Sequence, residues 1–469
     1  MKKKRIYISL WVIAVCLCGS VFGQYRIIVK IENTKDTILL LGNYYLDNTY
    51  AIDTARLTKK GFVFEKKDKQ LEDGIYFFTN TNGKFCEFII SQSRSFDLTT
   101  DDADWNGKMK VRNSKENEIY FQYLKATNDL SEKVKVIRRV KDSIGDAEYN
   151  RQYDMLRMQN DSVKEAFAQR YPDHLLTKVL NCTKPIIVPA FEFKGDSIKY
   201  EEERFVWYKE HFFDNVDFSC RGLLRTPKGV FFSVYDRFWT EVLKYEREDT
   251  ILLYADKVIA KCTDSMMYRY VVHNITERYL KSNVMGQDKV YVEMIKKYYK
   301  TGKAWWMPPS SVESEVARAE KWDNLLLGKT VPNFACPDTS GIWHNLYSLN
   351  AKYKILLFWS PECGHCAVEM PKIIEFYNNR DKQNINAEVF SVCTEGSTDE
   401  WKKKLQQYKT KWTDVYGMES TMDWREYFDI ETTPQIYILD TDNKIIGKKL
   451  AGDNIEGYLK AVDEGRFIP

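Results

Sequence analysis

A pair of cysteines separated by two residues constrains this chain more than any other feature. The run Cys363–Cys366 reads Cys-Gly-His-Cys, and it follows the apolar stretch Lys354–Trp359. That stretch predicts a buried strand, and a helical pattern begins at Ala367. The first cysteine is therefore expected at a helix N-terminus, where unpaired backbone N–H groups and the helix dipole favour a thiolate. This order indicates a reactive thiol site.

Other uses of a Cys-x-x-Cys pair fit the sequence less well. A zinc site needs four ligands, and the chain has no second Cys-x-x-Cys. Attachment of c-type haem needs a histidine directly after the second cysteine, where this chain has Ala367. A purely structural disulfide would close a very small loop and would gain little stability. We therefore predict redox exchange, with no metal and no cofactor.

A second signal lies about seventy residues further on. The strand-like run Ile430–Asp440 is interrupted near its start by Pro434. Proline is excluded from central strands unless it has a positional role. A cis Thr433–Pro434 bond would be such a role, and it would place Thr433 beside the cysteines with its backbone free to pair with a substrate strand. The alternative is an ordinary turn proline on an edge strand. The turn Asp440–Lys444 then predicts a hairpin.

These residues together resemble a known family. The segment from about Gly328 to Pro469 is similar to the thioredoxin fold, specifically the extracytoplasmic reductases of the TlpA/ResA type. The resemblance is carried by Phe358–Cys366, Glu369–Pro371, Thr433–Pro434 with Ile438–Asp440, and by Val331–Phe334 with the turn Asp338–Gly341, which resembles the family's extra N-terminal hairpin. It covers about the last third of the chain. It implies a thiol–disulfide oxidoreductase with protein thiols or disulfides as substrates and a membrane-bound thiol as electron donor.

The mechanism that follows assigns catalysis to Cys363 and Cys366. Cys363 would attack a substrate disulfide, and Cys366 would resolve the mixed disulfide. Residues expected to tune the pair or to bind substrate are Trp359, Pro361, Glu362, Gly364, His365, Thr433 and Pro434. Trp359 and Pro361 are expected to shape the surface around Cys363.

His365 is the most informative of the tuning residues. A partly protonated imidazole near Cys363 would stabilise the thiolate and raise the reduction potential. Protein disulfide isomerase carries the same Cys-Gly-His-Cys sequence, so the site could be less reducing than thioredoxin. The alternative is that His365 is a surface residue of minor effect. One departure from thioredoxin concerns its buried acid before the Cys-x-x-Cys, because this chain has Leu357 there. Proton handling would then use another group, Glu362 or water.

Three rival functions remain open or are weakened by the sequence. A disulfide oxidase or isomerase is favoured by the His365 argument and disfavoured by the family resemblance. A peroxiredoxin expects a threonine three residues before its cysteine, which Phe358–Cys366 lacks. The non-enzymatic alternative is a partner-binding protein whose first two thirds recognise the partner and whose redox domain is accessory.

The N-terminus has the features of a secretory signal peptide, predicted for residues 1–23. Lys2–Arg5 is the charged region, Ile6–Cys18 is the apolar region, and Val21–Gly23 offers a cleavage site. Lipid attachment at Cys16 or Cys18 is disfavoured because Val15 and Leu17 precede them. We therefore predict a periplasmic protein, where disulfides persist, rather than a membrane-anchored lipoprotein. Cys393, at the end of a strand-like run, is expected to fill the core, with a resolving thiol as the alternative.

Three domains are expected after the signal peptide. Residues 24–112 alternate short β-rich runs with turns and predict a β-sandwich. Residues 113–326 show charged runs with apolar residues at helical spacing and predict a mostly α-helical domain. Residues 327–469 form the α/β thioredoxin-like domain. The net charge of +3 with interspersed signs argues against a nucleic-acid binder. The first two domains would supply substrate specificity or homodimerisation.

Overall fold

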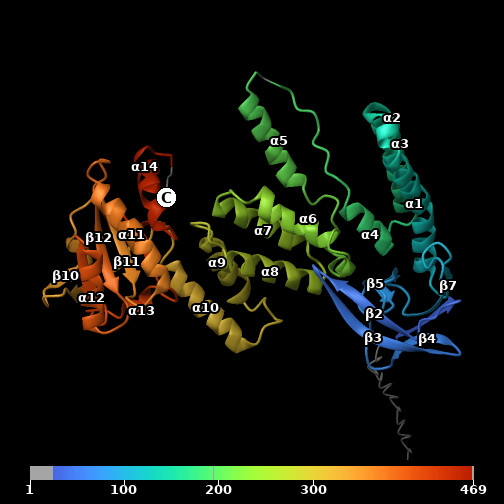
Figure 1. Ribbon diagram of the computed structural model, residues 1–469, viewed down its shortest axis with the longest axis horizontal. Helices are drawn as coiled ribbons and strands as arrows, with labels where there is room; N and C mark the ends of the chain where they lie inside the picture. The colour runs from blue at the N-terminus through green and yellow to red at the C-terminus, as the bar shows by residue number, and fades with distance from the viewer. Residues whose placement is uncertain (1–24, 194, 467–469) are drawn as a thin grey trace, which may run out of the picture. The chain divides into compact units, whose positions relative to one another are not determined.

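The computed structural model describes residues 25–193 and 195–466. The chain divides into two compact units, Met1–Lys244 and Tyr245–Pro469, and each is described by itself below (Figure 1). The predicted signal peptide lies outside the described residues. Among the described helices, none is both long enough and apolar enough to span a bilayer.

The first unit contains an eight-stranded sheet, which confirms the predicted N-terminal all-β fold. Its strands are β1 (Tyr25–Glu32), β2 (Ile38–Tyr45), β3 (Asn48–Thr58), β4 (Gly61–Lys66), β5 (Gly74–Thr79), β6 (Phe85–Ile90), β7 (Ser95–Asp101) and β8 (Lys110–Arg112), in the order β6-β5-β2-β3-β4-β1-β7-β8. The long strand β3 pairs with β2 along most of its length and with β4 at its end. Side chains from both halves of the sheet, among them Leu41, Phe78, Val29 and Phe96, share one hydrophobic core.

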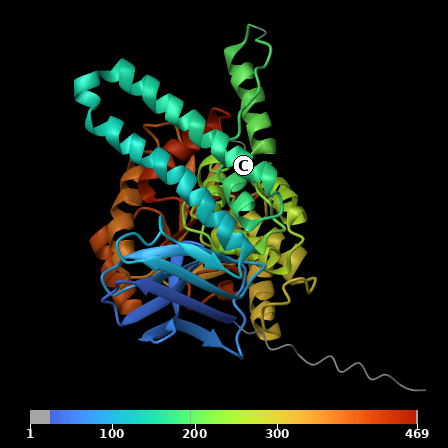
Figure 2. The ribbon, with the colours of Figure 1, turned by 90° about the vertical axis from the view of Figure 1, so that its right-hand side faces the viewer.

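Helices follow the sheet, as the sequence predicts. The long helices α1 (Lys115–Arg139) and α3 (Asp146–Arg170) form an antiparallel hairpin that extends away from the sheet (Figure 2). The start of α1 is tied to the sheet, because Asn117 exchanges two hydrogen bonds with the backbone of Ile89. The other helices of this unit are α2 (Lys141–Ile144), α4 (Leu175–Cys182), α5 (Ser197–His211), η1 (Arg221–Arg225), α6 (Phe231–Arg237) and η2 (Phe238–Val242).

The second unit begins with helices that pack on the C-terminal domain. These are α7 (Glu248–Lys261), α8 (Ser265–Leu280), α9 (Asp288–Met294), η3 (Ile295–Tyr299) and α10 (Pro309–Asp323). Lys448 of the C-terminal sheet forms a buried ion pair with Asp288 at the start of α9 and also donates to the carbonyl of Leu325. The border between the two compact units, between Lys244 and Tyr245, therefore falls inside the predicted helical domain. Its boundaries at residues 113 and 326 stay a prediction.

The C-terminal domain is a five-stranded sheet covered by helices, which confirms the predicted thioredoxin fold. Its elements are β9 (Ala335–Pro337), β10 (Trp343–Asn345), η4 (Leu346–Ser348), β11 (Tyr353–Trp359), α11 (Gly364–Asn379), β12 (Ala387–Cys393), α12 (Thr398–Tyr408), β13 (Thr413–Tyr416), α13 (Trp424–Tyr427), β14 (Gln435–Leu439), β15 (Ile445–Lys448), η5 (Gly452–Asn454) and α14 (Ile455–Asp463). The sheet order is β13-β12-β11-β14-β15, with β11 at the centre. The predicted extra hairpin is present as β9 and β10.

The two faces of this sheet bury different cores. One core joins β11 and β12 to α11, α12 and α14, and it contains Trp359, Cys366 and Cys393. The other core joins the sheet to the β9–β10 hairpin and to α13 through residues such as Phe334 and Phe428. Strand β11 is buried at every position, as its continuous apolar run predicts. The reactive pair thus begins at the end of the most buried strand, on the face that α11 covers.

Candidate active site

The chain turns from strand to helix at the predicted cysteine pair. Strand β11 ends at Trp359, three residues form a turn, and Cys363 is the N-cap residue of α11. Its sulfur accepts a hydrogen bond from the backbone N–H of Cys366 at 3.2 Å. This is the side-chain capping contact that serine or aspartate makes at other helices. The predicted strand, Cys-x-x-Cys and helix arrangement is therefore confirmed.

The environment of Cys363 favours its thiolate. Partial burial opposes ionisation and is the largest single influence, but hydrogen bonds from Cys366, from Thr433 and from the backbone N–H of His365 together outweigh it. The pKa of the Cys363 thiol therefore lies below its ordinary value. Hydrogen bonds that a thiolate accepts stabilise the charged form, and the helix N-terminus adds the same sign of field. Cys363 is partly exposed at the surface of the protein.

Cys366 has the opposite environment. Its side chain is fully buried in the core under α11. Burial is the main reason why the pKa of Cys366 rises to about 12, and the neighbouring Cys363 sulfur adds to the rise. The pair thus consists of one accessible thiol that ionises readily and one buried thiol that stays protonated. This asymmetry matches the separate roles of a nucleophile and a resolving thiol.

The proline loop lies against the first cysteine. The bond between Thr433 and Pro434 is cis, as predicted. The Cys363 thiol donates to the carbonyl oxygen of Thr433 at a distance of 3.1 Å. Strand β14 begins directly after this loop and pairs antiparallel with β11. The two predicted signals, about seventy residues apart in the sequence, therefore meet at one sulfur atom.

The remaining predicted residues divide into exposed and buried ones. Gly364, His365 and Glu362 are exposed. A Cβ atom added to Gly364 would meet nothing within 4 Å, so the surface beside the sulfur is open. Pro361 is half-buried and packs near Gly396. Trp359 is fully buried in the core under α11, so the prediction that it shapes the surface around Cys363 is wrong.

Two residues near the site were not singled out from the sequence. The indole N–H of Trp359 donates to the hydroxyl of Ser391 on β12 at 2.7 Å. Ser391 in turn pairs with Asp414 on β13 in the register of the sheet. Leu357, at the position where thioredoxin carries its buried acid, is fully buried in the same core. Cys393 also lies there, and burial raises its pKa to about 12, which fits the predicted core role.

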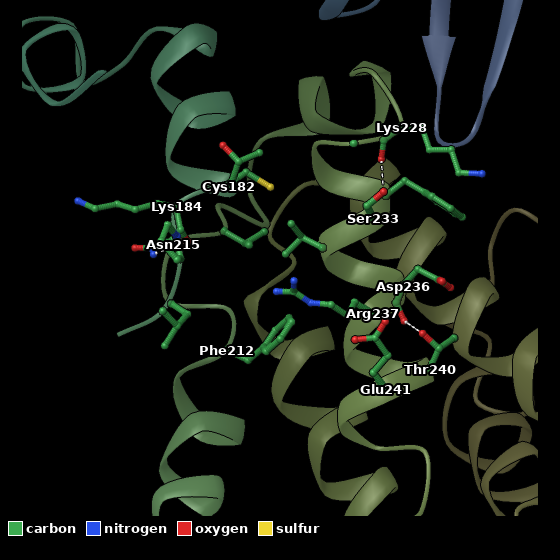
Figure 3. A pocket seen from close by; sticks show the side chains of 17 residues that line it. Cys182, Lys184, Phe212, Asn215, Lys228, Ser233, Asp236, Arg237, Thr240 and Glu241 are labelled. Carbon is green, nitrogen blue, oxygen red and sulfur yellow. Dashed lines mark hydrogen bonds between the residues drawn. The ribbon is translucent and has the colours of Figure 1, made fainter. Parts of the chain in front are cut away.

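The first unit has a separate surface cavity of about 570 Å³ next to α4, α6 and the residues after α5 (Figure 3). Lys184, Lys228 and Arg237 are among its lining residues. The hydroxyl groups of Thr183, Ser233 and Thr240, which also line it, all donate to main-chain carbonyls. These hydroxyls are thus used to hold helical backbone, and the cavity presents no aligned nucleophile and base among its lining residues in the described chain.

Comparison with protein families gives a match to the part of the chain that holds this site. Residues 327–448 match the family model described as AhpC/TSA family. A comparison with curated proteins found no match for the chain.

Comparison with solved structures gives related domains. A domain of a possible thiol-disulfide isomerase from Cytophaga hutchinsonii is 34% identical, with 30% of this chain and 95% of that chain covered and a TM-score of 0.28. The thioredoxin domain of a thiol-disulfide oxidoreductase from Bacteroides vulgatus is 25% identical, with 29% and 96% covered and a TM-score of 0.26. A thioredoxin-like protein from Bacteroides caccae is 20% identical, with 59% and 98% covered and a TM-score of 0.48.

Proposed function

Because the chain belongs, through its C-terminal domain, to the thioredoxin-like thiol–disulfide oxidoreductases, we propose that Cys363 and Cys366 transfer electrons to protein disulfides outside the cytoplasm. The observation that carries this proposal is the contrast between the two sulfur atoms. Cys363 is accessible and has a lowered pKa, whereas Cys366 is buried and has a raised pKa.

The exchange proceeds in two balanced steps. The Cys363 thiolate attacks one sulfur of a substrate disulfide, which forms a mixed disulfide and releases one substrate thiolate. The Cys366 thiol then loses its proton and attacks the Cys363 sulfur, which releases the second substrate thiol. Two electrons have moved to the substrate, and the protein holds a Cys363–Cys366 disulfide. A membrane-bound thiol donor would return the pair to its reduced form.

The loop around Thr433 supports substrate binding in this scheme. The Thr433 carbonyl lies 3.1 Å from the Cys363 sulfur. An extended substrate segment that pairs with the backbone of this loop would hold its disulfide at the nucleophile. Gly364 leaves room for such a segment, because a side chain there would extend into open space.

The geometry of the site is compatible with both directions of electron transfer. The same contacts that stabilise the Cys363 thiolate also stabilise the reduced protein, and they raise the reduction potential. This favours the second candidate, a disulfide oxidase or isomerase. The lower surface exposure of the resolving thiol does not discriminate between the two directions.

The deciding experiment is the reduction potential of the Cys363–Cys366 pair. The mature protein is equilibrated with glutathione buffers, and the redox state of each cysteine is read by mass spectrometry. A potential near or below about −270 mV supports the reductase, and one near about −180 mV supports the oxidase or isomerase. The matched control is Cys393→Ser, which removes a buried thiol of the same core and should leave the potential unchanged. Absence of reversible exchange at the pair contradicts the proposal.

A further inference from the structure

The loop that carries Thr433 is held at both of its ends. At one end, Gln435 begins strand β14 and pairs with the central strand β11. At the other end, Phe428 is buried in the core that joins the sheet to the β9–β10 hairpin. Between these ends, Glu431 and Thr432 are exposed. The position of Thr433 therefore depends on how firmly the few residues after Phe428 are fixed.

Asp429, the residue after Phe428, is bound by helix α10. The indole N–H of Trp322 donates to its carboxylate. The ammonium group of Lys321 lies 4.0 Å from the same carboxylate, whose side chain is only 20% exposed. At a mostly buried acceptor, the loss of a donor costs more than it does at an exposed one. Helix α10 ends at Asp323, before the residues 327–448 that match the family model. A helix from outside that domain thus fixes the start of the loop.

Trp322 is itself held in place by its neighbours. Its ring lies 5.0 Å from the ring of Tyr291 on α9, at an interplanar angle of 62°. The ammonium group of Lys449 lies 5.7 Å from the centre of the indole. Tyr291 is fully buried, and its hydroxyl donates to the carboxylate of Glu315 on α10 at 2.6 Å. Helices α9 and α10 are therefore joined at the place from which the indole reaches Asp429.

The fixed end of the loop is close to the reactive sulfur along the chain. Thr433 follows Asp429 by four positions in the sequence. Its carbonyl lies 3.1 Å from the sulfur of Cys363. A segment of this length spans at most about 14 Å, so a displacement of Asp429 changes where the backbone of Thr433 can lie. A loop that is fixed before binding loses less conformational entropy when a substrate strand pairs with it.

We propose that Trp322 is a positioning residue for substrate binding, because its bond to Asp429 holds the backbone of the Thr433 loop ready to pair with an extended peptide. This rests on the proposed function. The bond acts on the binding of a substrate that has a peptide backbone, and it leaves the sulfur chemistry unchanged. A disulfide that has no peptide backbone therefore reacts equally well with or without this bond.

The test uses Trp322→Phe, which keeps an aromatic ring against Tyr291 but removes the N–H donor. The pre-reduced protein is followed through a single turnover with two substrates, an extended peptide that contains one disulfide and hydroxyethyl disulfide. For the peptide, the half-saturating concentration should rise by roughly three- to tenfold, and the maximal rate should stay within about twofold. The rate with hydroxyethyl disulfide should also stay within about twofold. Equal losses with both substrates, or no change with the peptide, would overturn the proposal.

A change on the loop side tests whether the two residues act as a pair. Asp429→Ala removes the acceptor and should give the same shift as Trp322→Phe. The double variant should add less than about twofold to either single change, because both changes remove one bond. Glu320→Gln is the matched control, since it removes an exposed ion pair between α10 and Lys300 at 2.7 Å and should match wild type. Shifts that multiply in the double variant would contradict the proposal.

Hydrogen exchange examines the loop without any redox activity. Peptides that cover residues 430–435 should exchange at least about threefold faster in Trp322→Phe and in Asp429→Ala than in wild type. Thermal unfolding should show that each variant is folded. If wild type reacts with neither disulfide, the proposed function fails, and the exchange rates alone decide the role of Trp322. Wild-type exchange rates in both variants would overturn that role.

Discussion

Two cysteines among the described residues occupy the N-cap of a helix, and only one of them has the features of a nucleophile. Cys363 is the N-cap residue of α11 in the second unit, and its sulfur accepts a capping hydrogen bond, whereas Cys220 is the N-cap residue of the short helix η1 in the first unit and makes no side-chain capping bond. Backbone N–H groups lower the pKa of both thiols. Yet the pKa of Cys363 lies below its ordinary value, whereas burial and then the charge of Asp217 raise the pKa of Cys220 to about 11. A helix N-terminus is therefore insufficient to activate a thiol.

The two thiols differ in their access to solvent and in the residues that surround their sulfur atoms. Cys363 is partly exposed, and hydrogen bonds with Cys366, Thr433 and the backbone N–H of His365 lower its pKa. Cys220 packs against the core of the N-terminal sheet, and the charge with the largest effect on its pKa is the negative charge of Asp217. Burial destabilises a thiolate by more free energy than hydrogen bonds from one or two backbone N–H groups can offset. The reactivity of a thiol in this protein therefore depends on all the groups around its sulfur atom. A Cys-x-x-Cys pair provides a second cysteine among these groups, and a single cysteine at a helix N-terminus does not.

The largest expected effect is the loss of turnover when Cys363, the N-cap residue of α11, is replaced. Cys363→Ser should lower the rate of reduction of a model protein disulfide by on the order of a thousandfold or more, because a hydroxyl cannot form the mixed disulfide. Cys220→Ser is the matched control at the other cap and should stay within about twofold of wild type. A large loss in Cys220→Ser with an unchanged melting temperature would break the comparison.

The second expected effect is trapping of the intermediate. Cys366→Ser leaves the nucleophile intact but removes the resolving thiol, so the mixed disulfide between Cys363 and the substrate should accumulate. Mass spectrometry of the protein under non-reducing conditions should show one substrate molecule attached at Cys363. Attachment at any of the other cysteines instead would assign the nucleophile to a different residue and contradict the asymmetry described above.

The third effect is a difference in alkylation rate. A thiolate reacts with iodoacetamide and a thiol does not, so each rate rises with pH through the pKa of its cysteine. In the reduced protein, the rate for Cys363 should reach half its maximum at a lower pH than the rate for an ordinary cysteine, because its pKa is lowered. Since the pKa of Cys220 is about 11, its modification near neutral pH should be at least about a hundredfold slower. Comparable alkylation rates for Cys363 and Cys220 in the folded protein would show that the two thiols ionise to a similar extent.

The contrast also marks what the sequence could predict. The buried strand, the cysteine pair, the cis proline and the extra hairpin are each encoded within a short segment, and all four are confirmed. Trp359 is also a near neighbour of the pair in sequence, but its burial depends on the packing of α11 and α12 against the sheet. Short segments of sequence determine local backbone geometry. The environment of each side chain is determined by residues that are distant in the sequence.

Asp414 shows this limit most clearly. Nothing near it in the sequence indicates that it lies in one row with Leu357, because that row exists only through the pairing of β11 with β12 and of β12 with β13. The row that joins Leu357, Ser391 and Asp414 combines segments that are tens of residues apart. The absence of an acid at position 357 is visible in the sequence, whereas the acid in the same row is found only from the register of the sheet.

The smallest expected effect tests which of the two causes dominates at Cys220. Asp217→Asn removes the negative charge and frees Lys178, which pairs with Asp217 at 2.9 Å and whose charge lowers the pKa of Cys220. Burial remains, and it is the larger influence. The pKa of Cys220 should therefore fall by less than about one unit, and alkylation near neutral pH should rise by less than about tenfold. Alkylation of Cys182 in the same protein is the internal control, since its pKa is raised chiefly by burial. A rise that brought Cys220 close to Cys363 would mean that charge, and not access to solvent, separates the two caps.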